Sequence, residues 1–225
     1  MALRLVLFDL DGTLADTAPD IARATNVVLA EAGRPPLPLA RIRSIVSSGA
    51  RALLRAGFEN DTPSEAEIDG LAQRLFDVYA ERPAAATTVF PGLAELIAEL
   101  PGLGAGWGVV TNKPERLAGP IVAAFKLAPP PGCIIGGDTL AARKPDPLPL
   151  LEACRRADVA PAEALYVGDA EIDVRTARAA GMPVAVAGFG YAPAAQTVRT
   201  WQPDVIADSV DALRTALLER LAPAA

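Results

Sequence analysis

The stretch "VLFDLDGTLADT" (residues 6–17) places Asp9 and Asp11 two positions apart, at the point where an apolar run ends. Gly12 and Thr13 follow at once. A carboxylate can attack an electrophile, exchange a proton or bind a metal ion. One aspartate after a strand is an ordinary turn residue, but two carboxylates that share a small volume need a compensating charge. The pair therefore indicates a site where carboxylates do chemistry beside a cation.

Further polar side chains follow later apolar runs of the chain. Thr111 ends the run "WGVVTN", Lys144 follows "CIIGGD" within "RKPDP", and Asp169 ends "LYVGD". Each alone has an ordinary explanation, as a turn residue, a helix cap or a solvated charge. In an open α/β sheet, however, the carboxyl ends of the strands line the ligand crevice. We therefore expect these side chains to converge with the aspartate pair.

The expected cluster carries an excess of negative charge. Asp9, Asp11, Asp169 and Asp173 bring up to four carboxylates, and Lys144 is the only lysine that we place near them. Two unit charges about 4 Å apart repel by roughly 4 kcal/mol at an effective dielectric of about 20. Mg²⁺ is commonly bound by one or two carboxylates together with substrate phosphate oxygens. The sequence thus predicts Mg²⁺ as the cofactor and a phosphate group as its neighbour.

Short and nearly continuous apolar runs predict strands that are buried on both faces, as in a parallel sheet. We expect strands within 3–9, 107–112, 133–138, 165–169, 183–188 and 204–208. Helical segments separate or follow them, at 90–100, 115–126, 147–157, 171–180 and 209–221. This alternation predicts an α/β fold with a doubly wound parallel sheet.

One interval is too long for a simple crossover between neighbouring strands. Residues 16–88 are expected to form an inserted helical cap domain, and 1–15 together with 89–225 form the α/β core domain. Helices are expected at 17–32, 38–47, 50–58 and 64–82. Asp16 and Thr17 should cap the first of these helices, and Ser64 with Glu67 forms a capping box for the last.

The composition excludes several classes of function. A formal charge of −6 and a pI near 4.8 argue against a nucleic-acid partner or an anionic membrane. The chain has no histidine, which removes Ser–His and Cys–His mechanisms and His-ligated zinc. Cys133 and Cys154 lack CxxC spacing and suit buried thiols in a reducing compartment. With no signal-peptide pattern and no membrane-length apolar run, we expect a cytoplasmic protein that does not contact membranes.

Four motifs, "DLDGT" (9–13), "VVTN" (109–112), "RKPDP" (143–147) and "GDAEID" (168–173), resemble the ordered motifs of the haloacid dehalogenase-like (HAD) phosphatase superfamily. The resemblance covers the whole core, and the insertion is similar to that superfamily's small helical cap. Within the superfamily, the chain is similar to the phosphoglycolate phosphatase group, including its N-acetylmuramic acid 6-phosphate phosphatase relatives. The resemblance implies a Rossmann-like core and a Mg²⁺-dependent phosphatase that hydrolyses a small phosphate monoester.

The resemblance also implies a role for each matching residue. Asp9 is the expected nucleophile, which forms an aspartyl-phosphate, and Asp11 is the expected general acid and base. Mg²⁺ is expected to bind the Asp9 carboxylate, the Asp11 backbone carbonyl and Asp169. Phosphoryl oxygens are expected to be bound by Thr111, Asn112 and Lys144. Substrate contacts are expected from Gly12 and Thr13. Asp173 is expected to orient Lys144 or a water molecule bound to the metal.

The same motif residues distinguish a phosphatase from related activities. Haloacid dehalogenases lack an acid two residues after the nucleophile, so Asp11 favours phosphate chemistry. Phosphonatases need a lysine in the cap, and residues 16–88 contain none. A sugar phosphomutase of the β-phosphoglucomutase type stays open as the alternative, although its cap acid–base pair typically includes His or Lys. A non-catalytic phosphate-binding protein is a remote alternative, because no motif residue is lost.

The cap segment "SIVSSGARALL" (44–54) is the expected substrate selector. Gly49 precedes a helix whose first turn contains Arg51, and a helix N-terminus with an arginine suits a carboxylate. Both favoured substrates, phosphoglycolate and N-acetylmuramic acid 6-phosphate, carry a carboxylate away from the phosphate. An ordinary surface arginine is an equally good explanation of Arg51. The oligomeric state, monomer or homodimer, is left open by the sequence.

Overall fold

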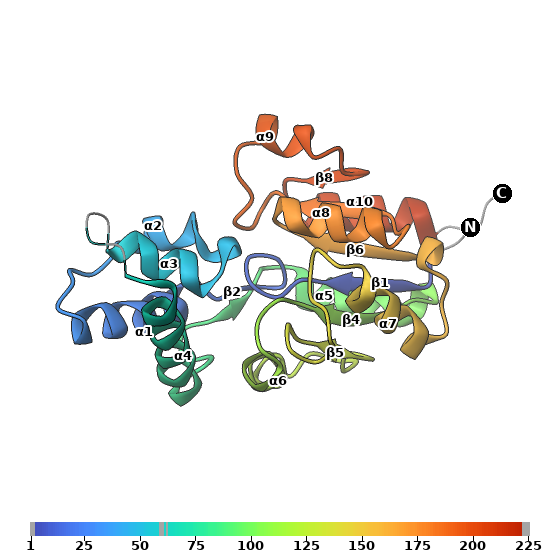
Figure 1. Cartoon of the computed structure of the whole chain (residues 1–225). Helices are drawn as coiled ribbons and strands as arrows, with labels where there is room; N and C mark the ends of the chain where they lie inside the picture. The colour runs from blue at the N-terminus through green and yellow to red at the C-terminus, as the bar shows by residue number, and fades with distance from the viewer. Residues whose placement is uncertain (1–2, 59–60, 62, 222–225) are drawn as a thin grey trace.

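The computed structural model describes residues 3–58, 61 and 63–221. Its centre is a six-stranded sheet with the order β5-β4-β1-β6-β7-β8 (Figure 1). Every pairing in this sheet is parallel. The strands are β1 (Leu5–Phe8), β4 (Gly106–Val110), β5 (Ile134–Ile135), β6 (Ala164–Gly168), β7 (Val184–Ala187) and β8 (Val205–Ala207). Each overlaps its expected apolar run. The ends of β6, β7 and β8 agree with the expectation to within one residue, whereas β1, β4 and β5 differ from it by two or three residues at one end.

Helices cover both faces of the sheet, because alternate residues of the strands face opposite sides. On β1, Val6 and Phe8 belong to one buried cluster, whereas Leu5 and Leu7 belong to the other. The first cluster includes side chains of α5 (Leu93–Glu99), α6 (Glu115–Ala124) and α10 (Val210–Leu221). The second includes side chains of α7 (Leu148–Ala157), α8 (Glu171–Ala179) and α9 (Ala195–Thr200). The predicted doubly wound α/β fold is confirmed.

Between β1 and β4 the chain forms a helical unit beside the sheet (Figure 1). It contains α1 (Ala18–Glu31), α2 (Leu39–Arg43), α3 (Ala50–Gly57) and α4 (Glu65–Glu81). A short antiparallel ribbon of β2 (Ala15–Asp16) and β3 (Thr88–Val89) leads into and out of this unit. The exact division at residues 16 and 88 stays a prediction. The capping box of Ser64 and Glu67 at the start of α4 is confirmed.

The start of α1 differs from the expectation. Thr17 is at the N-cap position, but its side chain makes no capping hydrogen bond. Instead, the backbone N–H of Ala18 donates to the hydroxyl of Tyr191 at 2.8 Å. The same hydroxyl donates to Asp16 at 2.6 Å, and Asp16 also pairs with Arg43 at 2.5 Å. The cap of α1 therefore comes from the loop after β7, because that loop lies against the entry to the helical unit.

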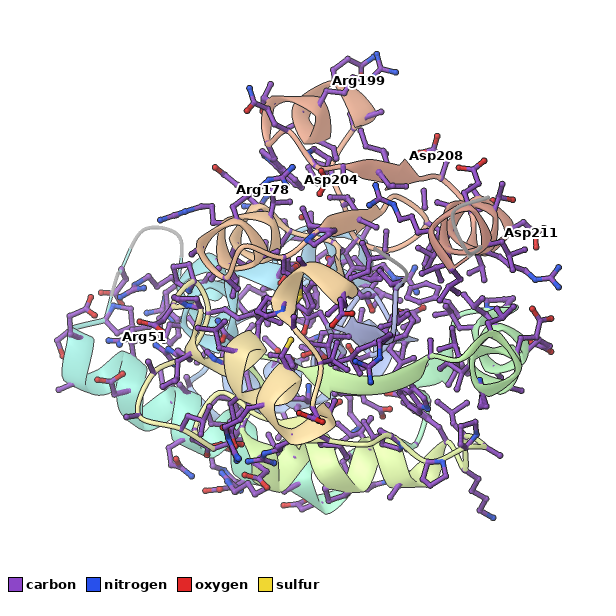
Figure 2. The ribbon with its side chains drawn as sticks, turned by 90° about the vertical axis from the view of Figure 1, so that its right-hand side faces the viewer. Arg51, Arg178, Arg199, Asp204, Asp208 and Asp211 are labelled. Carbon is purple, nitrogen blue, oxygen red and sulfur yellow. The ribbon has the colours of Figure 1, made fainter. Side chains whose placement is uncertain are left out.

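Several short elements and surface contacts complete the structure. The 3₁₀ turns are Val46–Ser48, Leu100–Leu103 and Pro161–Glu163. Arg178 on α8 pairs with Asp204 at 3.0 Å, which ties this helix to the segment before β8 (Figure 2). Cys133 and Cys154 are buried free thiols. Among the described residues, no helix is both long enough and apolar enough to cross a bilayer.

Candidate active site

The carboxyl ends of β1, β4 and β6 lie side by side and carry the expected polar residues. Asp9 follows β1, Thr111 follows β4, and Asp169 follows β6. Asp9, Asp11, Thr111 and Lys144 line one cavity of about 650 Å³. Residues of the helical unit, among them Gly49 and Tyr79, line it from the other side. Segments that are distant in the sequence therefore meet at one site between the sheet and the helical unit.

Lys144 is held at the centre of a buried network. Its ammonium group lies 3.0 Å from Asp9 and 2.6 Å from Asp173, and it donates to the Tyr166 hydroxyl at 2.8 Å. Burial opposes the charge of Lys144, but the carboxylates of Asp173 and Asp9 outweigh it and raise the pKa of Lys144 above its ordinary value. Lys144 is therefore a fixed cation beside the Asp9 carboxylate.

Asp173 is fully buried, and both of its carboxylate oxygens are occupied by donors. One oxygen accepts from Lys144 at 2.6 Å and from the Tyr166 hydroxyl at 3.2 Å. The other accepts the backbone N–H groups of Asp169 and Ala170 at 3.1 and 3.0 Å. This arrangement orients Lys144 and the start of α8, which supports the positioning role expected for Asp173.

Asp169 is bonded on both oxygens by hydroxyl groups. Thr13 donates to one oxygen at 3.2 Å, and Ser47 of the helical unit donates to the other at 2.8 Å. Thr13 is fully buried and does not line the cavity. Gly12, with a φ of 80°, turns the backbone beneath the Tyr191 ring. In this structure Gly12 shapes the turn and Thr13 holds Asp169, and a substrate contact of either residue stays a prediction.

The buried carboxylates are incompletely compensated within the protein. Burial raises the pKa of Asp9 from 3.8 to about 6, with Lys144 acting in the opposite direction. Burial also raises the pKa of Asp169 well above its ordinary value, and Asp173 adds to the shift. Carboxylate oxygens of Asp9, Asp169 and Asp173 lie within 4.8 Å of one another. Because neutral hydroxyls cannot balance these charges, the donor set fits a hard divalent cation. Asp9 and Asp169 would hold it.

Lys113 corrects the prediction that Lys144 is the only lysine in the cluster. Its ammonium lies 3.0 Å from one oxygen of Asp11 and 3.3 Å from the other. The side chain is only 7% exposed. The segment "TNKP" contained the signal, since Lys113 comes two residues after Thr111. A lysine so close to a strand end falls inside the same crevice, and the sequence interpretation missed it.

The other residues expected to bind substrate, Asn112, Gly49 and Arg51, lie in different surroundings. Asn112 donates from its amide to the Lys144 carbonyl at 3.1 Å, while its side-chain oxygen has no partner among the described residues. Gly49 lines the cavity with a φ of 86°, which favours glycine at the turn before α3. Arg51 also lines the cavity but pairs with Glu65 at 2.6 Å and Asp69 at 3.1 Å. Its guanidinium, labelled in Figure 2, therefore already has two acidic partners on α4.

Comparison with known proteins agrees with the geometry of this site. The family model of the haloacid dehalogenase-like hydrolases matches residues 6–187. The chain therefore belongs to this hydrolase family, and the resemblance of its four motifs is confirmed.

Similar proteins indicate which group of this hydrolase family the chain resembles. The chain is 43% identical to a phosphoglycolate phosphatase of Xylella fastidiosa over 91% of this chain and 89% of that protein. It is 39% identical to an N-acetylmuramic acid 6-phosphate phosphatase of Pseudomonas aeruginosa over 97% and 98% of the two chains. The crystal structure of a predicted phosphoglycolate phosphatase from Haemophilus somnus 129pt superposes with a TM-score of 0.82 at 28% identity, covering 95% of this chain and 98% of that one. The protein is thus an enzyme similar to phosphoglycolate phosphatases.

Proposed function

We propose that the protein is a cytoplasmic, Mg²⁺-dependent phosphatase that hydrolyses phosphoglycolate or N-acetylmuramic acid 6-phosphate through an aspartyl-phosphate on Asp9. The names of the similar proteins support both substrates. The observation that carries the proposal is the convergence of Asp9, Asp11, Thr111 and Lys144 on one cavity. A carboxylate nucleophile, an acid and a fixed ammonium at one place suit phosphoryl transfer through a covalent intermediate.

In the first step, an oxygen of Asp9 attacks phosphorus and the bond to the ester oxygen breaks. Asp11 gives its proton to the leaving alkoxide. In the second step, Asp11 takes a proton from a water molecule that attacks phosphorus, which releases inorganic phosphate and restores the Asp9 carboxylate. Lys144 stabilises charge on the phosphoryl oxygens, because Asp173 and Tyr166 hold its ammonium in position before the reaction. Thr111 and Asn112 are proposed to bind further phosphoryl oxygens.

Mg²⁺ would be held by Asp9, Asp169 and the Asp11 carbonyl. When bound, it neutralises the carboxylates and polarises the phosphoryl group. The Thr13 and Ser47 hydroxyls then keep the Asp169 carboxylate in a single orientation.

A panel of phosphate esters tests this function. We expect phosphate release from phosphoglycolate, N-acetylmuramic acid 6-phosphate or both, with loss of activity after exhaustive EDTA dialysis and recovery on adding Mg²⁺. Ca²⁺ should compete with Mg²⁺ and inhibit, because it prefers more ligands at longer distances and allows Asp9 to chelate it. Full activity after EDTA dialysis would contradict the metal assignment.

Thermal unfolding gives a readout of the metal site that does not depend on turnover. Saturating Mg²⁺ should stabilise the wild type, by about 2.7 kcal/mol at a concentration of roughly 100 times Kd. Asp169→Asn should remove this Mg²⁺-induced rise in Tm, whereas Asp211→Asn, an exposed aspartate of α10 (Figure 2), should keep it. An undiminished rise in the Asp169→Asn variant would show that the cation binds elsewhere.

A phosphomutase is the second candidate function, and one feature of the structure favours it. Lys113 supplies a cavity lysine from the core, although residues 16–88 contain neither His nor Lys. A mutase would return the phosphoryl group to a sugar and yield an isomeric sugar phosphate, whereas a phosphatase transfers it to water. Because we propose a phosphatase, we expect inorganic phosphate as the product of any sugar ester in the panel.

Arg51 and Gly49 are proposed to contact a substrate carboxylate that lies far from the phosphate, as on the lactyl group of N-acetylmuramic acid 6-phosphate. Arg51→Ala should then lower kcat/KM for that ester by about 1.5–3 kcal/mol, the range for a hydrogen bond to a charged group. An unsubstituted aryl phosphate should be nearly unaffected, since it binds through the core. Equal losses on both esters would instead mean that Arg51 supports the structure of the helical unit through Glu65 and Asp69.

A further inference from the structure

Lys113 lies beside the acid of the proposed reaction, inside the cavity. Its ammonium contacts both oxygens of Asp11, at 3.0 and 3.3 Å, and its side chain is nearly buried. Among the described residues that line the cavity, the other cations are Arg51, Arg143 and Lys144. Lys144 is committed to Asp9 and Asp173, and Arg51 pairs with Glu65 and Asp69. Among the described residues of the cavity lining, Lys113 is therefore the cation that is nearly buried and pairs with a single acidic residue, Asp11.

Tyr79 brings a second group to the same place from the opposite wall. It belongs to α4, is 1% exposed and lines the cavity, and Lys113 lies over its ring, 4.3 Å from the centroid. Its hydroxyl has no hydrogen-bond partner among the described residues. A buried hydroxyl without a partner is destabilising by roughly 1–3 kcal/mol, so this group is available to a ligand.

The position of Asp11 determines which part of a substrate can contact the Lys113 ammonium and the Tyr79 hydroxyl. To protonate the leaving alkoxide, Asp11 must come within hydrogen-bond distance of the ester oxygen. Lys113 lies one hydrogen bond beyond Asp11. A substituent on the carbon that bears the ester oxygen can therefore reach Lys113 and Tyr79. Two acceptor oxygens on that substituent match one ammonium and one phenolic donor.

We propose that Lys113 and the Tyr79 hydroxyl form the receptor for a substrate carboxylate carried on the carbon that bears the phosphate ester. This inference rests on the proposed phosphatase function and narrows its substrate to 2-phosphooxy carboxylates. Phosphoglycolate has its carboxylate at this position. The carboxylate of N-acetylmuramic acid 6-phosphate is on a lactyl group across the sugar ring, out of reach of Lys113 when the phosphate is at Asp9.

Two esters that differ only in this group test the receptor. Phosphoglycolate is compared with 2-hydroxyethyl phosphate, in which a hydroxymethyl group replaces the carboxylate, and the readout is the ratio of their kcat/KM values. Lys113→Met should lower the ratio by about 30-fold or more, within the range for a lost charge-assisted hydrogen bond. Any loss that comes from Asp11 losing its partner affects both esters and cancels in the ratio.

Two further variants complete the test. Tyr79→Phe should lower the ratio by about 3–10-fold. Its Tm should be no lower than that of wild type, because a buried hydroxyl without a partner among the described residues does not stabilise the fold. Lys126→Met removes the same charge at a position after α6, away from the cavity lining, and should leave the ratio within about twofold of wild type, as distant changes usually do.

Each outcome decides between distinct conclusions. An unchanged ratio in both Lys113→Met and Tyr79→Phe, with phosphoglycolate hydrolysed by the wild type, overturns the receptor and leaves the phosphatase standing. A wild type that releases phosphate from neither ester, under conditions where it hydrolyses no other ester, overturns the proposed function as well. A lowered ratio in both variants supports the receptor.

Discussion

Replacing Asp9 with asparagine should abolish phosphate release from every ester that the wild type hydrolyses. The amide is nearly the same size as the carboxylate, but it cannot form the aspartyl-phosphate. Steady-state phosphate release measures the loss, which should exceed a thousandfold, since removal of the covalent nucleophile of a serine protease costs about 10⁶ in kcat. Residual activity within tenfold of wild type would exclude Asp9 as the nucleophile.

The stability of the same variant separates a chemical loss from a folding loss. The folded state raises the pKa of Asp9 from 3.8 to about 6, chiefly through burial. A raised pKa means that the folded state holds the proton more tightly, so the stability from this group is lost as pH rises from about 4 to about 6. The asparagine side chain of the variant does not titrate. Metal-free Asp9→Asn should therefore be at least as stable as the metal-free wild type at pH 7, and a large fall in Tm would undermine the kinetic interpretation.

Asp11→Asn should slow the hydrolysis of alkyl phosphates by several orders of magnitude, because both proton transfers are lost, each worth about 10²–10⁴. With 4-nitrophenyl phosphate the first step needs no proton donor, since nitrophenolate is a good leaving group. We therefore expect a burst of about one nitrophenolate per enzyme, followed by slow turnover as the aspartyl-phosphate waits for water. Stopped-flow absorbance measures the burst.

The burst is also the discriminating feature of this variant. Linear nitrophenolate release from the first turnover, at a rate near that of wild type, would show that Asp11 does not activate the attacking water. Equal losses on alkyl and nitrophenyl esters in the first turnover would instead assign Asp11 a role in binding and not in proton transfer.

The sequence located the core of the site because parallel strands impose its geometry. Asp9, Thr111 and Asp169 each end an apolar run, and β1, β4 and β6 are neighbours in the sheet. Lys144 and Asp173 lie in the loop and helix that follow two of the predicted strands, and they meet at 2.6 Å. Once a run is identified as a parallel strand, the place of the residue after it is largely determined.

Contacts between the helical unit and the α/β core could not be predicted from the sequence. Ser47 donates to Asp169, Tyr79 lies against Lys113, and Tyr191 caps α1. Each contact joins segments whose mutual orientation depends on how the helical unit sits over the sheet, and no local pattern encodes that orientation. The ribbon of β2 and β3 was missed for a different reason, since two-residue strands leave no periodicity to detect.

The helix caps show the same contrast on a small scale. Ser64 and Glu67 are three residues apart and satisfy each other locally, so the capping box was predicted. At α1 the local candidate, Thr17, was displaced by a hydroxyl from Tyr191, whose loop packs against Asp16 in three dimensions. Tertiary contacts override local preference where the chain returns to the same place.

Trapping the covalent intermediate tests the central claim most directly. Asp11→Asn mixed with Mg²⁺ and 4-nitrophenyl phosphate is quenched in acid within the burst, digested at low pH and analysed by mass spectrometry. The proposed mechanism predicts one phosphate on the peptide that contains Asp9, removed by hydroxylamine as expected for an acyl phosphate, and none in the double variant that combines Asp9→Asn with Asp11→Asn. A full burst with no phosphopeptide, or with the phosphate on another peptide, would contradict it.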